Sequence, residues 1–129
     1  MGGWQGLSLG NLMEKTGEVY QTAPRDIVVT NRDFTYANVE AWKNIIESYR
    51  QIHPEHNVVI LYEGKTLANL ISLFKLETQP NRHGFQMVVA APDKNLKDVP
   101  KLYRFLVEGA GPNFARFIQK EMYQVLKLF

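Results

Sequence analysis

Three histidines are the side chains of this sequence best suited to metal or acid–base chemistry. His53 and His56 are separated by Pro54 and Glu55, and His83 follows in a later polar stretch. Two imidazoles and a carboxylate would suit zinc, and folding could bring His83 to the other two. Pro54, however, breaks the helical register that usually aims paired histidines at one ion, and no definite third and fourth ligands can be identified. We therefore expect no bound metal, and we interpret His53 as the polar end of a helix.

The sequence motifs give little support to nucleotide binding or to catalysis by a nucleophilic side chain. Gly64-Lys65-Thr66 invites comparison with a phosphate-binding loop, but that motif needs a glycine five positions before Gly64, where Val59 stands. Gly-x-Ser-x-Gly is absent, and Ser48 and Ser72 lie among apolar-periodic residues, as small polar fillers often do. The absence of cysteine excludes thiol catalysis, disulfides and thiolate metal sites. The sequence offers no catalytic residue, so a non-catalytic role without a cofactor is favoured over an enzymatic one.

Cationic side chains form a second group of candidates. They are Arg82, Arg104, Arg116 and Lys120. Folding could gather them into a surface that binds anions or nucleic acid, with aromatic rings available for stacking on bases. Residues 101–129 hold five basic and two acidic side chains, yet the net charge of the whole chain is only +2. Because nucleic-acid-binding domains are usually strongly basic and carry a recognisable motif, this function is the less favoured one.

The composition is that of an ordinary globular protein. Its 129 residues are 45% hydrophobic and 22% charged, which argues against long disordered stretches and favours one domain over residues 1–129. Residues 1–6 are glycine-rich and are expected to be loosely ordered. No apolar run approaches the ~20 residues that span a bilayer, and the start lacks the order of a signal peptide. We therefore expect a soluble, cytoplasmic protein that does not bind membranes.

Two helix patterns occupy residues 96–129 and are separated by Gly109-Ala110-Gly111-Pro112. The first is expected to begin at Asp98, whose carboxylate can cap free N–H groups, and to end at Gly109 in the left-handed conformation. The second has apolar residues at three- and four-residue steps, which predicts a helix from residue 112 to the end. These residues are Phe114, Phe117, Ile118, Met122, Val125, Leu126 and Phe129.

Upstream residues predict the elements on which this helical pair packs. A short helix is expected from Ser8 to Lys15. Two strands follow, Glu18 to Thr22 and Asp26 to Asn31, and the tight connection Ala23-Pro24-Arg25 between them predicts an antiparallel hairpin.

The period then changes from two to about 3.6, which predicts a helix. Its apolar stripe is Val39, Trp42, Ile45, Ile46, Tyr49 and Ile52. Thr35 or Asn38 can cap its start, and Pro54 ends it because the residue before a proline avoids helical geometry. The β-branched run Asn57 to Tyr62 predicts a central strand.

The stretch from Lys65 to Glu77 decides the fold class. As a strand it follows a turn at Glu63-Gly64, enters a polar loop and precedes a strand from Phe85 to Ala91, which gives a mixed or mainly antiparallel sheet of about five strands. The alternative makes residues 66–76 helical and gives a three-layer α/β fold. We favour the antiparallel α+β fold, because a parallel sheet of three strands would be small to cover on both faces.

The expected order is helix, two strands, helix, three strands and two helices. This order resembles the profilin-like layout of roadblock and longin modules, which serve in those families as dimerisation and docking platforms. The likeness covers most of the chain in element order. It implies a protein that works by binding, although architecture alone does not fix function.

Apolar surface beyond the needs of the core is the remaining functional signal. The candidate interface residues are Tyr103, Val107, Phe114, Phe117 and Tyr123. A wide apolar face on a small domain closes either on its own core or on another subunit. The leading hypothesis is therefore an interaction or assembly module that binds itself, as a homodimer, or another protein. The alternative is a ligand-binding or enzymatic domain whose pocket gathers the three histidines.

Overall fold

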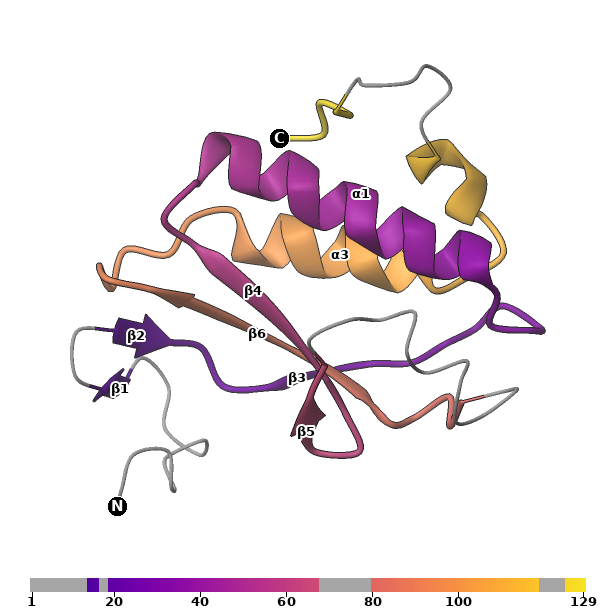
Figure 1. Ribbon diagram of the computed structural model, residues 1–129, viewed down its shortest axis with the longest axis horizontal. Helices are drawn as coiled ribbons and strands as arrows, with labels where there is room; N and C mark the ends of the chain where they lie inside the picture. Colours follow the sequence, from indigo (N-terminus) through magenta and orange to yellow (C-terminus); the bar gives the residue numbers. More distant parts are fainter. Residues whose placement is uncertain (1–13, 17–18, 68–79, 119–124) are drawn as a thin grey trace.

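The computed structural model of residues 1–129 describes residues 14–16, 19–67, 80–118 and 125–129 (Figure 1). Within these residues an antiparallel sheet carries two helices on one of its faces. The strands are β1 (Glu14–Thr16), β2 (Val19–Gln21), β3 (Arg25–Ile27), β4 (Asn57–Tyr62), β5 (Lys65–Thr66) and β6 (Phe85–Ala91). The helices are α1 (Tyr36–Ile52), α3 (Val99–Gly109) and the short 3-10 helix η2 (Phe114–Phe117). The α+β fold with an antiparallel sheet is thus confirmed.

Strand β6 is the centre of the sheet. The strand order is β1-β2-β6-β4-β5, and β3 also pairs with β6. Along the β4–β6 pair, Asn57 lies opposite Ala90 and Tyr62 lies opposite Phe85. Side chains alternate between the two faces of a strand, so β6 directs Phe85, Met87 and Val89 toward the helices, where all three are fully buried.

Strands β2 and β3 do not form the predicted hairpin. Both pair antiparallel with β6, so they run one after the other along the same neighbour. Gln21 lies opposite Ala90 and Arg25 opposite Met87, which leaves one extra residue on the β2–β3 side. Such a bulge bends a strand without ending it, and the Thr22 hydroxyl accepts a β6 backbone N–H there. The proline-containing connection is therefore a bulge between two strands that pair with β6.

A two-residue turn joins β4 to β5 as predicted. Leu61 pairs with Thr66 and Tyr62 with Lys65, which leaves Glu63 and Gly64 as the loop. Their φ angles are 52° and 80°, and two successive positive values match the twist of an antiparallel hairpin. Gly64 has the positive φ expected of it. Lys65 and Thr66 are strand residues, whereas residues 68–79 lie outside the described part of the chain.

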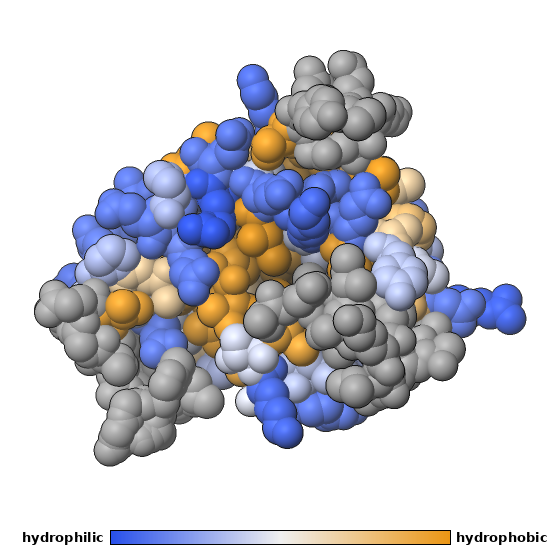
Figure 2. All heavy atoms as spheres, viewed as in Figure 1, coloured by the Kyte–Doolittle hydropathy of each residue, from blue (hydrophilic) through white to orange (hydrophobic). Residues whose placement is uncertain are grey.

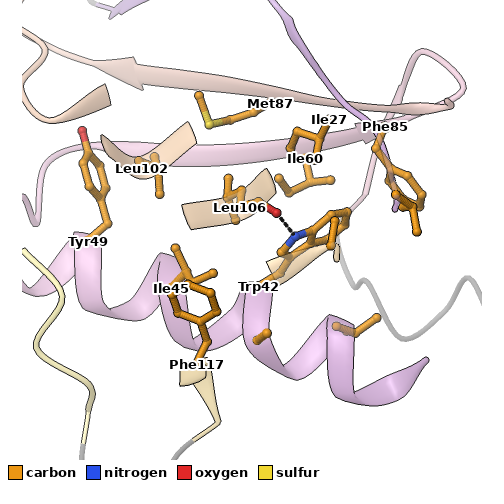
Figure 3. Packing of buried hydrophobic residues seen from close by; sticks show 14 of the residues in the cluster. Ile27, Trp42, Ile45, Tyr49, Ile60, Phe85, Met87, Leu102, Leu106 and Phe117 are labelled. Atoms are coloured by element: carbon orange, nitrogen blue, oxygen red, sulfur yellow. Dashed lines mark hydrogen bonds between the residues drawn. The ribbon is translucent and has the colours of Figure 1, made fainter. Parts of the chain in front are cut away.

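Helix α1 supplies most of the aromatic core. It begins after Thr35, whose backbone N–H donates to the Asn38 side chain, and it ends at Ile52, with His53 as its cap residue before Pro54. Trp42 and Tyr49 are fully buried. Figure 3 shows how these side chains meet residues of α3 and of the sheet. In the space-filling view, polar side chains cover much of the region where α1 lies, and an apolar area is visible below it (Figure 2).

Helices α1 and α3 approach each other closely at Gly109. A Cβ atom added there would lie 3.0 Å from Ile45 Cδ1 and 3.2 Å from Trp42 Cδ1. Gly109 has no positive φ angle, and the cap residue Ala110 has φ −87°. The predicted left-handed end of this helix is therefore wrong. A side chain at this position would press on Ile45 and Trp42 of α1, which would have to shift to make room for it.

Replacing Gly109 by valine is expected to destabilise the protein by about 1–3 kcal/mol, the usual cost of overpacking a core. The change should lower the urea midpoint without changing the cooperativity of unfolding. Valine at Arg104, which is exposed on the same helix, is the matched control and should change stability little. A Gly109→Val protein as stable as the original would contradict the close approach.

The predicted last helix is not continuous. Residues Phe114–Phe117 form a 3-10 helix, Ile118 is extended, and residues 125–129 carry no helix. Residues 119–124 lie outside the described part of the chain, as does most of the helix predicted from Ser8 to Lys15. The last two residues of that earlier prediction, Glu14 and Lys15, belong to β1. No helix within the described ranges is both long enough and apolar enough to cross a bilayer.

Candidate functional site

The end of the chain returns to the helical layer on the side away from the sheet (Figure 1). Its last residue, Phe129, places its ring between the two helices. The ring centroid lies 5.2 Å from that of Tyr49 on α1 and 5.4 Å from that of Phe105 on α3. Both pairs are close to perpendicular, an arrangement that favours aromatic contact. We define Ser48, Tyr49, Lys101 and Phe105 as the docking face and residues 125–129 as the docked segment.

Polar side chains of α1 hold the backbone that follows α3. Buried Asn44 donates its amide to the Phe117 carbonyl oxygen at 2.8 Å. The Ser48 hydroxyl accepts the Leu128 backbone N–H, also at 2.8 Å. Four residues along a helix rise about 6 Å, so α1 holds two parts of the chain at neighbouring turns. Ser48, which the sequence presented as a small polar filler, is thus a hydrogen-bonding residue of the docking face.

Cations cover the aromatic rings of this site. Lys101 Nζ lies 5.8 Å from the Phe105 ring centroid and 5.5 Å from that of Phe129. The Arg116 guanidinium lies 5.2 Å from the Phe105 ring and 4.8 Å from the Phe117 ring, and it pairs with Glu108 at 3.3 Å. Cation–π contacts at partly exposed sites contribute about 0.5–1 kcal/mol each. The docking face therefore combines an apolar centre with a cationic rim.

A histidine cluster adjoins the docking face at Tyr49. The ring centroids of His53 and His56 lie 4.8 Å and 5.8 Å from that of Tyr49, and 4.9 Å from each other. His53 Nε2 lies 2.8 Å from an oxygen of Asp98. Asp98 therefore precedes α3 as predicted, but it makes no side-chain cap and binds His53 instead. Its φ of 60° is the left-handed conformation, which aspartate tolerates better than most residues.

Burial sets the proton affinities in this cluster. Burial, and then the nearby Asp98 carboxylate, raises the pKa of Tyr49 to about 12, so its hydroxyl stays a donor to the Lys97 carbonyl oxygen at 2.7 Å. Burial, and then His53, lowers the pKa of His56. Both ring nitrogens of His56 are buried and lack a hydrogen-bond partner among the described residues. The neutral imidazole is therefore the form that this site accommodates.

The family described as "Uncharacterised Treponema protein C-terminal domain" matches residues 20–116. The chain belongs to this family. It is also 35% identical over 103 residues to an "Uncharacterized protein" of Treponema pallidum (strain Nichols). That alignment covers 80% of this chain and 29% of the relative, so the chain spans less than a third of the relative's length. No solved structure matches.

The family match includes the whole docking face but not the docked segment. Ser48, Tyr49, Lys101 and Phe105 all lie within residues 20–116, as does the histidine cluster, whereas residues 125–129 follow the matched range. The docking face thus lies inside the range that matches the family, and the docked segment lies outside it.

The predicted interface residues have different positions. They are Tyr103, Val107, Phe114, Phe117 and Tyr123. The first three are half-buried, and the Tyr103 hydroxyl donates to the Asp26 carbonyl oxygen, which ties α3 to β3. Phe117 is fully buried within the chain, whereas its role at an interface stays a prediction. Tyr123 lies outside the described residues. Periodicity located apolar residues correctly but could not tell an internal contact from an external one.

The predicted cationic residues do not share one surface role. Arg82 donates to the Asn31 and Arg32 carbonyl oxygens, so its guanidinium holds the loop before α1. Arg104 is exposed, and Arg116 belongs to the rim of the docking face. Lys120 lies outside the described residues. The guanidinium groups of Arg82 and Arg116 thus both contact other groups of the same chain.

Folding unites two of the three candidate metal ligands. His56 precedes β4 at the end where Asn57 pairs with Ala90, whereas His83 precedes Phe85 at the opposite end. Five residue steps along a strand separate these ends by about 17 Å, and His83 is exposed. In the described ranges, no group of three or more His, Cys, Asp or Glu side chains could hold a metal ion. The three histidines therefore do not gather at one place, and the alternative of a ligand-binding or enzymatic domain stays a prediction.

Proposed function

We propose that this domain is a non-catalytic assembly module that forms a homodimer by exchanging residues 125–129 between two docking faces. The observation that carries the proposal is the seating of Phe129 between Tyr49 and Phe105. This contact joins the helices to a segment that belongs to neither a helix nor a strand. The docking face thus accepts an apolar segment without regular secondary structure as a ligand.

A second copy offers the same docking face and the same segment. In a two-fold symmetric dimer each copy would donate residues 125–129 to its partner, and each contact would be made twice. The segment is held by aromatic contacts, Lys101 and one backbone hydrogen bond to Ser48. Because none of these contacts ties the segment into a helix or a strand, a segment can leave its own face and enter that of another copy. High protein concentration favours this exchange over the intramolecular arrangement.

Engineered cysteines test the exchange, since the natural sequence contains none. One full-length chain carries Ser48→Cys, and a second, with a mass tag, carries Leu128→Cys. After the two are mixed at high concentration and oxidised, we expect a disulfide that joins the tagged chain to the untagged one. The Leu128 N–H contacts Ser48 in the structure, so these positions lie close whichever copy supplies the segment.

The matched control replaces Ser48→Cys by Arg50→Cys. Arg50 is exposed, and two residues along a helix turn about 200°, so it points away from Ser48. Mixed disulfides should be rare in this control. Equal yields from both pairs would contradict specific exchange, and so would a doubly substituted chain that forms only its internal disulfide at every concentration.

A further inference from the structure

The histidine cluster and the docked segment share one side chain, Tyr49. His53 and His56 contact its ring at 4.8 and 5.8 Å, and Phe129 contacts it at 5.2 Å. Phe129 thus packs against the same ring as the two imidazoles. Their position also joins α1 to the start of α3, through the contact between His53 and Asp98.

We propose that His56 is a pH-sensitive latch, whose protonation releases residues 125–129 from the docking face. This inference deepens the proposed function, on which it rests, because it assigns a control to the same site. Both His56 ring nitrogens are buried without a partner among the described residues. A proton on this ring creates a charge and a second N–H donor, and neither ring nitrogen has an acceptor among the described residues. The ring must then leave its contact with Tyr49 to reach water.

Charged groups around His56 act in both directions. His53 lies at a ring distance of 4.9 Å and disfavours a charged His56. Glu55 and Asp93 attract the charged form, but both are exposed, and their effect is smaller than those of burial and His53. The balance of these groups favours a neutral His56.

The direction of the pH effect follows from this balance. The pKa of His56 in the docked structure lies below its ordinary value of 6.5, because burial and His53 disfavour the charge. When the ring is released to solvent, it therefore binds a proton more tightly. The docked arrangement is fully stabilised above pH 6.5. That stabilisation is lost as the pH falls through the lowered pKa.

Hydrogen exchange at the Leu128 backbone amide measures the latch directly, since that N–H donates to Ser48 when the segment is docked. In the full-length protein, exchange rates corrected for intrinsic pH dependence should show protection at pH 7.5. The protection should fall severalfold by pH 5. In His56→Phe, which keeps an aromatic ring but cannot be charged, protection should persist at both pH values. His83→Gln, at an exposed histidine far from Tyr49, should behave like the original protein.

The exchange experiment can overturn the pH-sensitive latch and the proposed homodimer independently of each other. Unchanged Leu128 protection in the original protein between pH 7.5 and 5 would overturn the latch, and so would an equal loss in His56→Phe. Exchange reports docking whichever copy supplies the segment. A monomer at pH 7.5 that loses protection on acidification would therefore overturn the proposed dimer and support the latch.

Discussion

Replacing Trp42 by alanine is expected to destabilise the protein by about 4–5 kcal/mol, at the upper end for a large buried side chain. Trp42 is fully buried and packs against the rings of Phe34 and Phe85 at 5.2 and 5.1 Å. Its indole N–H also donates to the Leu106 carbonyl oxygen at 2.8 Å (Figure 3). Truncation would leave a cavity between α1, α3 and the sheet. Urea unfolding followed by circular dichroism measures the loss.

Trp42→Phe separates the two contributions. It keeps a ring in the cavity and removes the N–H donor. We therefore expect a smaller loss of unfolding free energy than for alanine. The lost hydrogen bond should contribute about 2 kcal/mol or less of it, and reduced packing contributes the rest. If Trp42→Ala lowered the free energy of unfolding by less than about 1 kcal/mol, the site could not be the centre of the core that the structure indicates.

Replacing Asn38 by leucine, which has a similar shape, is expected to cost about 3–5 kcal/mol, because several buried polar groups lose their partner and each costs about 1–3 kcal/mol. Asn38 is fully buried. Its amide donates to the Gly109 carbonyl oxygen at 2.8 Å and to that of Gly111 at 3.3 Å, and its oxygen accepts from the Thr35 backbone N–H. One side chain thus joins the start of α1 to the end of α3.

The control for this prediction is Asn95→Leu, at an exposed position, which should change the free energy of unfolding by no more than about 0.5 kcal/mol. Thermal and urea unfolding of the three proteins provide the comparison. Asn38→Leu with the stability of the control would show that the amide does not join the two helices.

Residue patterns predicted the elements whose formation depends mainly on local geometry and on one buried face. The α1 stripe, the β4 run and the positive φ of Gly64 are examples, since helix periodicity, β-branching and turn geometry act within a few residues. The helix, the strand and the positive φ are confirmed, except that Ile52 at the end of the stripe is exposed.

Predictions failed where distant parts of the chain compete with local preference. Ile118 lies within a helix pattern but is extended, and the carbonyl oxygen of its neighbour Phe117 accepts from Asn44 on α1. Gly109 shows the same limit, because the groups that a side chain there would press on, Ile45 and Trp42, belong to another helix. Long-range contacts of this kind leave no periodic trace in a single sequence.

The candidate site was only partly accessible to sequence analysis. Its apolar members lie in patterns that indicate burial, but the pairing of Phe129 with Tyr49 joins residues that are far apart in the sequence. Ser48 was expected to fill space, but it accepts a hydrogen bond from Leu128. Asp98 was expected to cap a helix, but it binds His53. The polar residues of α1 could have indicated the site, because they recur on the side of the helix that contacts the residues after α3. Asn44 and Ser48 are one helical turn apart, a spacing that suits two successive backbone contacts.

Light scattering of the full-length protein at pH 7.5, over a range of concentrations, tests the proposed assembly most directly. We expect the mass of two chains at high concentration for the original protein. Phe129→Asp, which removes the aromatic contacts with Tyr49 and Phe105, should give the mass of one chain with unchanged helix content. Lys127→Asp, at an exposed neighbour, should remain dimeric. The mass of a single chain at every concentration, or a dimer that persists in Phe129→Asp, would contradict assembly through the docked segment.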